Sequence, residues 1–428
     1  MKISAIILSA GNSTRFKSST PKVFQNLCGR PLIDFNVDLI RQNKKINDFN
    51  IITNKKLEKY FAKNGFQNTF IQNPVNGTGG AIQQYINKGP LKSDYYLICL
   101  GDTPVINKKI IDDFINQTIR KKLDINVLGQ QLSSPKGYGR LVVSKNNLIK
   151  IVEEKDCSAE EKNISLINTG FFLLSKKAIL LSKNIKKNIN KKEYYLTDLV
   201  EIGLDKKLKV SFTVNKYEKV LGVNTIEELQ SLEQEIQSNI KIQLTKKGVR
   251  FENPATTFIS MNSKIDKDVY IESNVVIKNN VFINKGTLIK AFTYLEDCEI
   301  GKECSIGPFA RIRPGTLIDN NVKIGNFVEI KKSHLKSGVK AGHLSYIGDS
   351  NVGKNSNIGA GTITCNYDGK KKNRCIIGDN CFIGSNSSIV APVKILNKAY
   401  IGAGSVITKD VPANTLSLTR IKQKFIKK

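Results

Sequence analysis

Aliphatic residues recur at every sixth position over much of the C-terminal part of the chain. The repeat holds in three runs, namely Ile265, Ile271, Ile277, Ile283, Ile289 and Leu295, then Ile300, Ile306, Ile312, Ile318, Ile324 and Ile330, and finally Ile377, Ile383, Ile389, Ile395, Ile401 and Ile407. A six-residue period fits neither an α-helix nor a simple alternating strand. It predicts a parallel β-solenoid in which each hexad supplies a short strand and a corner, with the aliphatic side chains stacked inward.

We expect the repeat to break at residues 331–346 and at residues 364–375. The second segment is too polar for a coil and should loop outward. The first contains both histidines of the chain, His334 and His343. Small residues precede His343, which favours an accessible imidazole ring and therefore a functional role.

The N-terminal half alternates between strand and helix patterns. The predicted strands are 3–8, 49–53, 95–100, 125–128 and 209–214, and the predicted helices are 34–44, 57–63 and 109–121. This alternation predicts a mostly parallel sheet with helices on both faces, whose ligands bind beyond the C-terminal ends of the strands. A further amphipathic helix, 225–244, ends before Gly248 and suits a connection between domains. We therefore expect domains at 1–224 and 251–428, joined by a helical linker at 225–250.

Composition narrows the possible classes of function. A chain of 428 residues is too long for one core. Its net charge of +30 raises the possibility of nucleic-acid binding, but the lysines are spread along the whole chain and Trp is absent, so we expect no nucleic-acid partner. No apolar run approaches a membrane span, and we expect neither a signal peptide nor a membrane partner. The eight cysteines form no C-x-x-C pair, which suggests reduced thiols and a cytoplasmic location.

The first predicted strand leads into a loop of small residues, Ser9-Ala10-Gly11-Asn12-Ser13, followed by Arg15 and Lys22. Such a loop lets backbone N–H groups approach phosphates, and the two cations would neutralise phosphate charge. The spacing matches neither a Walker A loop nor the Rossmann glycine pattern. Together with Gly101-Asp102 and Gly222-Val223-Asn224, the loop resembles the sugar-nucleotide pyrophosphorylases.

That resemblance implies a Rossmann-like nucleotidyltransferase domain and a set of site residues. Arg15 and Lys22 would be catalytic, and Asp102 and Asn224 would bind Mg²⁺. The residues implied in binding UTP and the UDP-sugar are Leu8, Ser9, Ala10, Gly11, Lys22, Gln72, Gly77, Thr78, Gly101, Gly139, Glu153, Asn168 and Asn224. The chain departs from the pattern expected of the family at Ser9, Phe16, Asn76, Gly80 and Leu221. Of these, Gly80 and Leu221 lie beside the segments for the base and the metal.

Four runs in the C-terminal half, 306–315, 325–329, 340–344 and 357–369, resemble the bifunctional bacterial uridylyltransferases and acetyltransferases of amino-sugar metabolism. The resemblance implies a left-handed parallel β-helix of hexapeptide repeats, so the fold class is α/β plus this β-helix. It implies His343 as the general base, and Arg313, Lys331, Tyr346 and Asn357 as ligands of glucosamine 1-phosphate. The implied acetyl-CoA residues are Ala360, Asn366, Tyr367, Ser385, Ala403 and Arg420.

The same resemblance implies two successive reactions and a homotrimer. Acetyl-CoA would acetylate glucosamine 1-phosphate, and uridylyl transfer from UTP to N-acetylglucosamine 1-phosphate would then release pyrophosphate. The product, UDP-N-acetylglucosamine, would supply peptidoglycan and lipopolysaccharide synthesis. An imidazole with a pKa of about 6.5 can accept the proton of the attacking amine at neutral pH. The alternative is a nucleotidyltransferase whose solenoid serves only as a scaffold, and the joint presence of His343, Arg313 and Lys331 argues against it.

Overall fold

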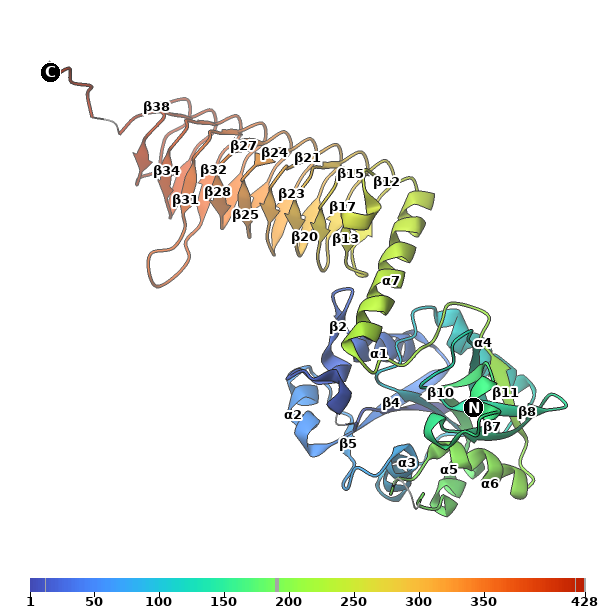
Figure 1. Ribbon diagram of the computed structural model, residues 1–428. Helices are drawn as coiled ribbons and strands as arrows, with labels where there is room; N and C mark the ends of the chain where they lie inside the picture. Colours follow the sequence, from blue (N-terminus) through green and yellow to red (C-terminus); the bar gives the residue numbers. More distant parts are fainter. Residues whose placement is uncertain (12, 189–191, 420, 427–428) are drawn as a thin grey trace. The chain divides into compact units, whose positions relative to one another are not determined.

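The structure is a computed structural model that describes residues 1–11, 13–188, 192–419 and 421–426 (Figure 1). The chain divides into two compact units, Met1–Gln230 and Ser231–Lys428, which are described separately below. No helix in the described part of the chain has the length and apolarity needed to cross a membrane.

The first unit is built on a nine-stranded sheet whose main path has the order β11-β7-β10-β6-β1-β4-β5. These strands are β1 (Ile3–Leu8), β4 (Ile46–Thr53), β5 (Thr69–Ile71), β6 (Tyr95–Leu100), β7 (Ile125–Gln131), β10 (Leu166–Ser175) and β11 (Val210–Val214). Strand β1 pairs in parallel with β4 and β6, whereas β10 runs antiparallel to β6 and β7. A hairpin of β8 (Arg140–Ser144) and β9 (Asn147–Val152) joins β10, and β2 (Asn26–Leu27) pairs with β3 (Arg30–Pro31). The predicted mostly parallel sheet is therefore confirmed.

Both faces of this sheet are buried, since the residues of β1 alternate between two separate cores and helices cover each face. Ile3, Ala5 and Ile7 belong to one core, and Ile6 and Leu8 to the other. The helices are α1 (Leu32–Gln42), α2 (Lys55–Lys63), α3 (Thr78–Lys88), α4 (Lys108–Arg120), α5 (Lys176–Leu180) and α6 (Leu199–Asp205). Helix α3 was not predicted, because it begins with Thr78-Gly79-Gly80 and glycine disfavours helix.

Helix α7 (Ile226–Lys246) corresponds to the predicted connecting helix and is followed by Gly248, whose φ is +95°. Within the second unit, polar groups attach this helix to the first coil of the solenoid. The side-chain amide of Gln237 donates to Ile259 O at 2.7 Å and accepts from Ile259 N at 3.0 Å. Lys241 Nζ donates to the carbonyl oxygens of Pro254 and Thr257 at 2.7 and 2.9 Å.

The second unit is a parallel β-solenoid with three sheets of ten, nine and eight strands. The first sheet contains β12 (Arg250–Phe251), β15 (Tyr270–Ile271), β18 (Leu288–Ile289), β21 (Ser305–Ile306), β24 (Lys323–Asn326), β27 (Lys340–His343), β30 (Asn357–Ile358), β33 (Phe382–Ile383), β36 (Tyr400–Ile401) and β38 (Leu416–Ser417). The second contains β13 (Phe258–Ile259), β16 (Val276–Ile277), β19 (Tyr294–Leu295), β22 (Arg311–Ile312), β25 (Glu329–Lys331), β28 (Tyr346–Gly348), β31 (Ile363–Cys365), β34 (Ser388–Val390) and β37 (Val406–Ile407). The third contains β14 (Lys264–Ile265), β17 (Phe282–Ile283), β20 (Cys298–Ile300), β23 (Thr316–Ile318), β26 (His334–Leu335), β29 (Ser350–Val352), β32 (Cys375–Ile377) and β35 (Val393–Ile395). The aliphatic residues of the repeat form one continuous core.

The expected break at residues 331–346 is wrong, whereas the one at 364–375 is confirmed. Strands β25 to β28 continue the three sheets without interruption, and Leu335 and Ala341 take fully buried core positions. The repeat is obscured there because Leu335 follows Ile330 after five residues, and because alanine replaces a larger aliphatic residue. Between β31 and β32, by contrast, the chain leaves the solenoid as an outward loop (Figure 1).

Candidate functional site

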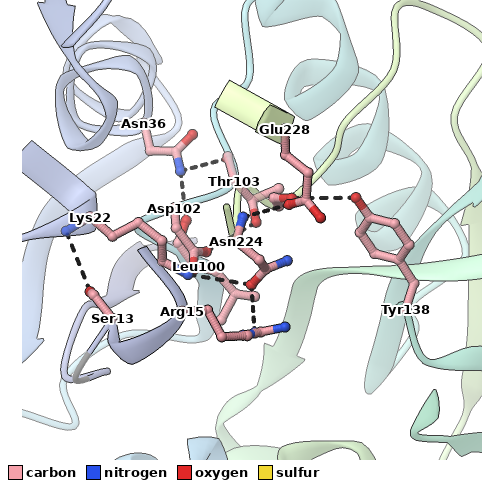
Figure 2. A network of polar contacts seen from close by, with 11 residues as sticks. Ser13, Arg15, Lys22, Asn36, Leu100, Asp102, Thr103, Tyr138, Asn224 and Glu228 are labelled. Carbon is pink, nitrogen blue, oxygen red and sulfur yellow. Dashed lines mark hydrogen bonds and ion pairs between the residues drawn. The ribbon is translucent and has the colours of Figure 1, made fainter. Parts of the chain in front are cut away.

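Two cations and two oxygen ligands meet at the C-terminal ends of β1 and β6 (Figure 2). Lys22 Nζ forms an ion pair with the carboxylate of Asp102 and lies 3.4 Å from Asn224 Oδ1. Arg15 Nη2 donates to the same Asn224 oxygen at 2.9 Å. The sequence separates these residues by up to 209 positions, so the fold assembles the cluster.

The turn that presents Asp102 is held by close backbone packing. Gly101 N donates to Leu8 O at 2.9 Å, and a Cβ at position 101 would lie 2.9 Å from Ile33 Cδ1 and still closer to Ser9 Oγ. A side chain at position 101 would therefore displace the side chains of Ser9 and Ile33. The Asn36 amide, which is 1% exposed, donates to Leu100 O at 2.8 Å and to Thr103 O at 2.9 Å. These bonds fix both sides of Asp102.

Asn224 is held from the opposite side by the first turn of α7. Its backbone N–H donates to Glu228 Oε2 at 2.6 Å, and the neighbouring Val223 N donates to Asp102 O at 2.9 Å. The hydroxyl of Tyr138 donates to Gly222 O at 3.3 Å. Burial, with the nearby carboxylates of Glu228 and Asp102, raises the pKa of Tyr138 to about 12, so this hydroxyl is a donor at neutral pH.

The donor set at this cluster suits a hard divalent cation. The carboxylate of Asp102 and the amide oxygen of Asn224 both contact the Lys22 ammonium, so a positive charge already lies where the two oxygens converge. Among the residues that the structure describes, no group of three or more His, Cys, Asp and Glu could hold a metal. A ligand set of one carboxylate and one amide fits Mg²⁺, which usually keeps waters and shares substrate phosphates.

A cavity of about 200 Å³ adjoins the cluster. Seven of the predicted site residues line it, namely Leu8, Thr78, Asp102, Gly139, Glu153, Asn168 and Asn224. Polar groups from the residue after β9, from β10 and from the segment before α6 therefore face one space. A cavity that combines apolar walls with several convergent polar groups suits a sugar ring.

Several carboxylates lie close to Glu153, which lines the cavity. Glu153 Oε1 accepts from Thr197 Oγ1 at 3.2 Å, but burial and the charges of Asp198, Asp156 and Glu193 raise the pKa of Glu153. Burial, Glu201 and Asp156 raise the pKa of Asp198 to about 6. These surroundings disfavour the charged form of Glu153. A sugar hydroxyl that donates a hydrogen bond to the carboxylate would stabilise that charged form.

The predicted segment for the base forms a tight turn before α3. The side-chain amide of Gln72 donates to Gly77 O at 2.9 Å and to Asn76 Oδ1 at 3.0 Å, so both of its protons are used within the turn. Gly77 has φ of +98°, and a Cβ there would lie 2.5 Å from Tyr194 O. Gly79 N donates to that same Tyr194 oxygen at 2.8 Å. The turn is thus closed against residues more than a hundred positions away.

In the solenoid, five predicted residues fall on two different sheets. His343 ends β27 and Asn357 begins β30, both in the first sheet. Arg313, Lys331 and Tyr346 lie in or directly after strands of the second sheet. The predicted base and the predicted phosphate-binding cations therefore lie on different sheets of the solenoid.

Three of the six predicted acetyl-CoA residues share a corner with His343, whereas Asn366 and Tyr367 lie directly after β31, where the outward loop begins. The strand register aligns Lys340, Asn357, Phe382 and Tyr400 on successive coils. The residues three positions after these, namely His343, Ala360, Ser385 and Ala403, therefore also follow one another along the corner. Asn386 N donates to Ala360 O at 2.7 Å and Gly404 N to Ser385 O at 2.8 Å. Arg420 lies outside the described residues.

The phosphate-binding candidates form a charged group with the outward loop. Arg313 Nη1 donates to Glu329 Oε1 at 2.6 Å. The close approach of Lys372 from the loop, with partial desolvation, lowers the pKa of Lys331. The Asn366 amide donates to the Asp349 carboxylate and to Tyr346 OH, the latter at 3.5 Å. Three cations near one strand are expected to attract a phosphate.

Sequence reasoning missed several residues that the structure brings to these sites, namely Asn36, Tyr138, Thr197, Glu228, Asn326 and Lys372. Asn36 had a signal, since a polar residue stands among the apolar positions of α1. The others belong to polar segments in which the sequence alone offers no means of choosing one residue.

Comparisons with known proteins agree with both units. A family model described as MobA-like NTP transferase domain matches residues 5–164, and one described as bacterial transferase hexapeptide (six repeats) matches residues 297–332 and 374–409. Relatives named bifunctional protein GlmU are 39% identical in Thermodesulfovibrio yellowstonii, 41% in Thermotoga maritima and 37% in Clostridium perfringens. The alignments cover 98%, 98% and 99% of this chain and 97%, 96% and 97% of those relatives.

The fold and these matches define a nucleotidyltransferase joined to a hexapeptide-repeat transferase. The solenoid is accordingly the left-handed β-helix predicted from the sequence. With full-length identities of this size, the chain belongs to the family of the bifunctional protein GlmU.

Proposed function

We propose that this enzyme makes UDP-N-acetylglucosamine in two steps, acetylating glucosamine 1-phosphate with acetyl-CoA and then transferring uridylate from UTP with release of pyrophosphate. The observation that carries the proposal is the presence of two separate groups of predicted site residues in one chain. One surrounds Asp102 and Asn224, and the other extends along the corner of the solenoid from His343 to Ala403. The product of the second step would supply peptidoglycan and lipopolysaccharide synthesis.

In uridylyl transfer, a phosphate oxygen of the sugar 1-phosphate attacks the α-phosphorus of UTP in line, and pyrophosphate leaves. Lys22 and Arg15 stand beside the two oxygen ligands and would neutralise the charge that develops on the phosphates. Mg²⁺ held by Asp102 and Asn224 would supply further charge neutralisation. Glu153, Gly139 and Asn168 would orient the amino sugar within the cavity.

In acetyl transfer, His343 would accept the proton of the sugar amine as the amine attacks the thioester carbonyl, and the CoA thiolate would leave. The small residues Ala360, Ser385 and Ala403 on the same corner leave room for an extended thioester ligand. Arg313, Lys331 and Lys372 would bind the sugar phosphate. Because these cations and His343 lie on different sheets, we propose a homotrimer in which neighbouring solenoids combine them.

The experiment that tests the function measures both reactions on two variants of the full chain. His343→Ala is expected to abolish acetyl transfer and to leave uridylyl transfer unchanged, and Asp102→Ala is expected to do the reverse. Each activity is therefore the folding control for the other variant. Acetylation that persists in His343→Ala would exclude this histidine as the base, and loss of both activities in either variant would contradict the separation of sites.

Two further proposals complete this assignment. Light scattering of the purified enzyme should give three times the 47.7 kDa chain mass if it is a trimer, and a monomeric active enzyme would refute that arrangement. Seven of the described cysteines, namely Cys99, Cys157, Cys298, Cys304, Cys365, Cys375 and Cys381, are free thiols, which is compatible with the proposed cytoplasmic location. Fractionation of the source cells would test it.

A further inference from the structure

The imidazole of His343 is hydrogen-bonded by one specific neighbour. Its Nδ1 lies 2.6 Å from the side-chain oxygen of Asn326, which occupies the same position one coil earlier. An amide oxygen has lone pairs and no proton, so it can only accept. Nδ1 must therefore carry the proton, which leaves the lone pair of the neutral ring on Nε2.

The backbone holds the two residues in this relation. Asn326 and His343 are direct partners in the parallel pairing of β24 and β27. Leu344 N donates to Asn326 O at 3.0 Å, and Ser345 Oγ donates to His343 O at 2.8 Å. Asn326 thus contacts both the imidazole ring and the peptide that follows it.

Gly325 lets the two coils approach closely at this point. A Cβ at Gly325 would lie 2.6 Å from the carbonyl carbon of Gly342 and 3.0 Å from its Cα, so no side chain fits there. The residues that follow, Asn326 and His343, are consequently in contact through their side chains. This arrangement limits the directions in which the imidazole can turn.

We propose that Asn326 is a positioning residue for acetyl transfer, because it holds His343 in the tautomer whose Nε2 is free to take the proton. The proposal rests on the assignment of His343 as the base. It explains why a neutral amide at this position is useful. A carboxylate would stabilise the protonated imidazole and so lower the fraction of neutral imidazole that can act as a base at neutral pH.

The surroundings of His343 contain no carboxylate on the adjoining strands. At its position the two neighbouring coils present Asn326 and Ala360, and the charged residues of β24 and β27 are Lys323 and Lys340. The other histidine provides a contrast within the same chain, because His334 Nε2 lies 2.9 Å from the carboxylate of Asp319. The Asp319–His334 pair is therefore a matched control, outside the proposed site.

The test uses Asn326→Ala, Asn326→Asp and the control Asp319→Asn in the full chain. Asn326→Ala should lower kcat for acetyl transfer by about ten- to a hundredfold, since general-base catalysis contributes about a hundredfold or more. The KM for glucosamine 1-phosphate and the rate of uridylyl transfer should not change. Asn326→Asp keeps an acceptor at Nδ1 and should recover most of kcat at high pH.

The pH profile separates positioning from simple structural support. The aspartate should raise the pKa of His343, so the acidic limb of the kcat profile should move upward by about one pH unit or more. Because the chain has two histidines, ¹⁵N-histidine labelling also reports each tautomer directly. His343 should show a protonated Nδ1 in the wild type and a mixture of tautomers in Asn326→Ala, whereas Asp319→Asn should alter only His334.

Three results would overturn the proposal. These are a kcat for Asn326→Ala within twofold of wild type, an unmoved acidic limb in Asn326→Asp, and an unprotonated Nδ1 at His343 in the wild type. None of them would affect the proposed function if His343→Ala still abolishes acetyl transfer. Acetylation that survives in His343→Ala would instead refute the base itself.

Discussion

The turn before α3 makes a prediction in which two substitutions compensate each other. Gly80 lies in the first turn of the helix, and a methyl group there would lie 2.6 Å from Asn76 Cγ and 3.1 Å from its Nδ2, with the Oδ1 atom closer still. Gly80→Ala must therefore displace the Asn76 side chain. That side chain accepts a hydrogen bond from Gln72 at 3.0 Å, which would be lost.

The expected energies have opposite signs. Gly80→Ala gains up to about 1 kcal/mol of helix propensity, but overpacking costs about 1–3 kcal/mol and the lost hydrogen bond about 1 kcal/mol. The single variant should therefore be destabilised by about 1–3 kcal/mol. Asn76→Ala alone loses the hydrogen bond but leaves no clash, which costs about 1 kcal/mol.

The double variant Asn76→Ala/Gly80→Ala should return close to wild-type stability, because the clash disappears and the helix gain remains. Scanning calorimetry of the full chain measures this, and a unit of some 230 residues should shift by about 2–4 °C per kcal/mol. The KM for UTP, measured alongside, reports whether Gln72 keeps its position. Strictly additive effects of the two substitutions, or a Gly80→Ala variant as stable as wild type, would refute the packing described here.

Two other predictions concern charge and core packing. Because the pKa of Asp198 is raised to about 6 from 3.8, the folded state holds its proton more tightly, and this group's contribution to stability falls as pH rises through that window. Asp198→Asn should remove that loss, so its free energy of unfolding relative to wild type should rise by about 1–2 kcal/mol between pH 4 and 7, after allowance for partial exposure. Melting temperatures of the two proteins across this pH range measure the change, and an unchanged difference would refute the shift. Ile312→Ala, at a fully buried position, should destabilise the solenoid by about 2–5 kcal/mol, whereas the matched outward-facing control Ile376→Ala, 38% exposed, should cost less than about 1 kcal/mol. Equal melting temperatures of these two variants would contradict the inward packing.

Much of the fold was predictable because burial imposes a period on the residues that form the cores. The six-residue repeat identified the solenoid, and strands 3–8 and 95–100 were predicted with the bounds that the structure has. The repeat failed as a guide at Leu335 and Ala341, where a five-residue step and a small side chain hide a coil that is structurally intact. Periodicity measures side-chain size and spacing, whereas stacking depends on the backbone.

The candidate sites were predictable only in part, for a related reason. Asp102 and Lys22 stood out because each follows an apolar strand or a loop of small residues. Glu228 and Asn326 did not, because each acts on another residue through one hydrogen bond that the fold creates. A contact of this kind depends on coil register and helix placement, and a single sequence shows neither.

The number of coils along the corner that carries His343, Ala360, Ser385 and Ala403 fixes the distance between its two ends. Successive parallel strands lie about 4.8 Å apart, so the three steps from His343 to Ala403 span about 14 Å. A coil inserted between them would move the imidazole one full step away from whatever the far end of the corner holds. The coils before β21 carry none of the predicted acetyl-transfer residues, so evolution is free to add or remove them. If acetyl-CoA binds along the corner as proposed, its dimensions set the number of coils between β27 and β36.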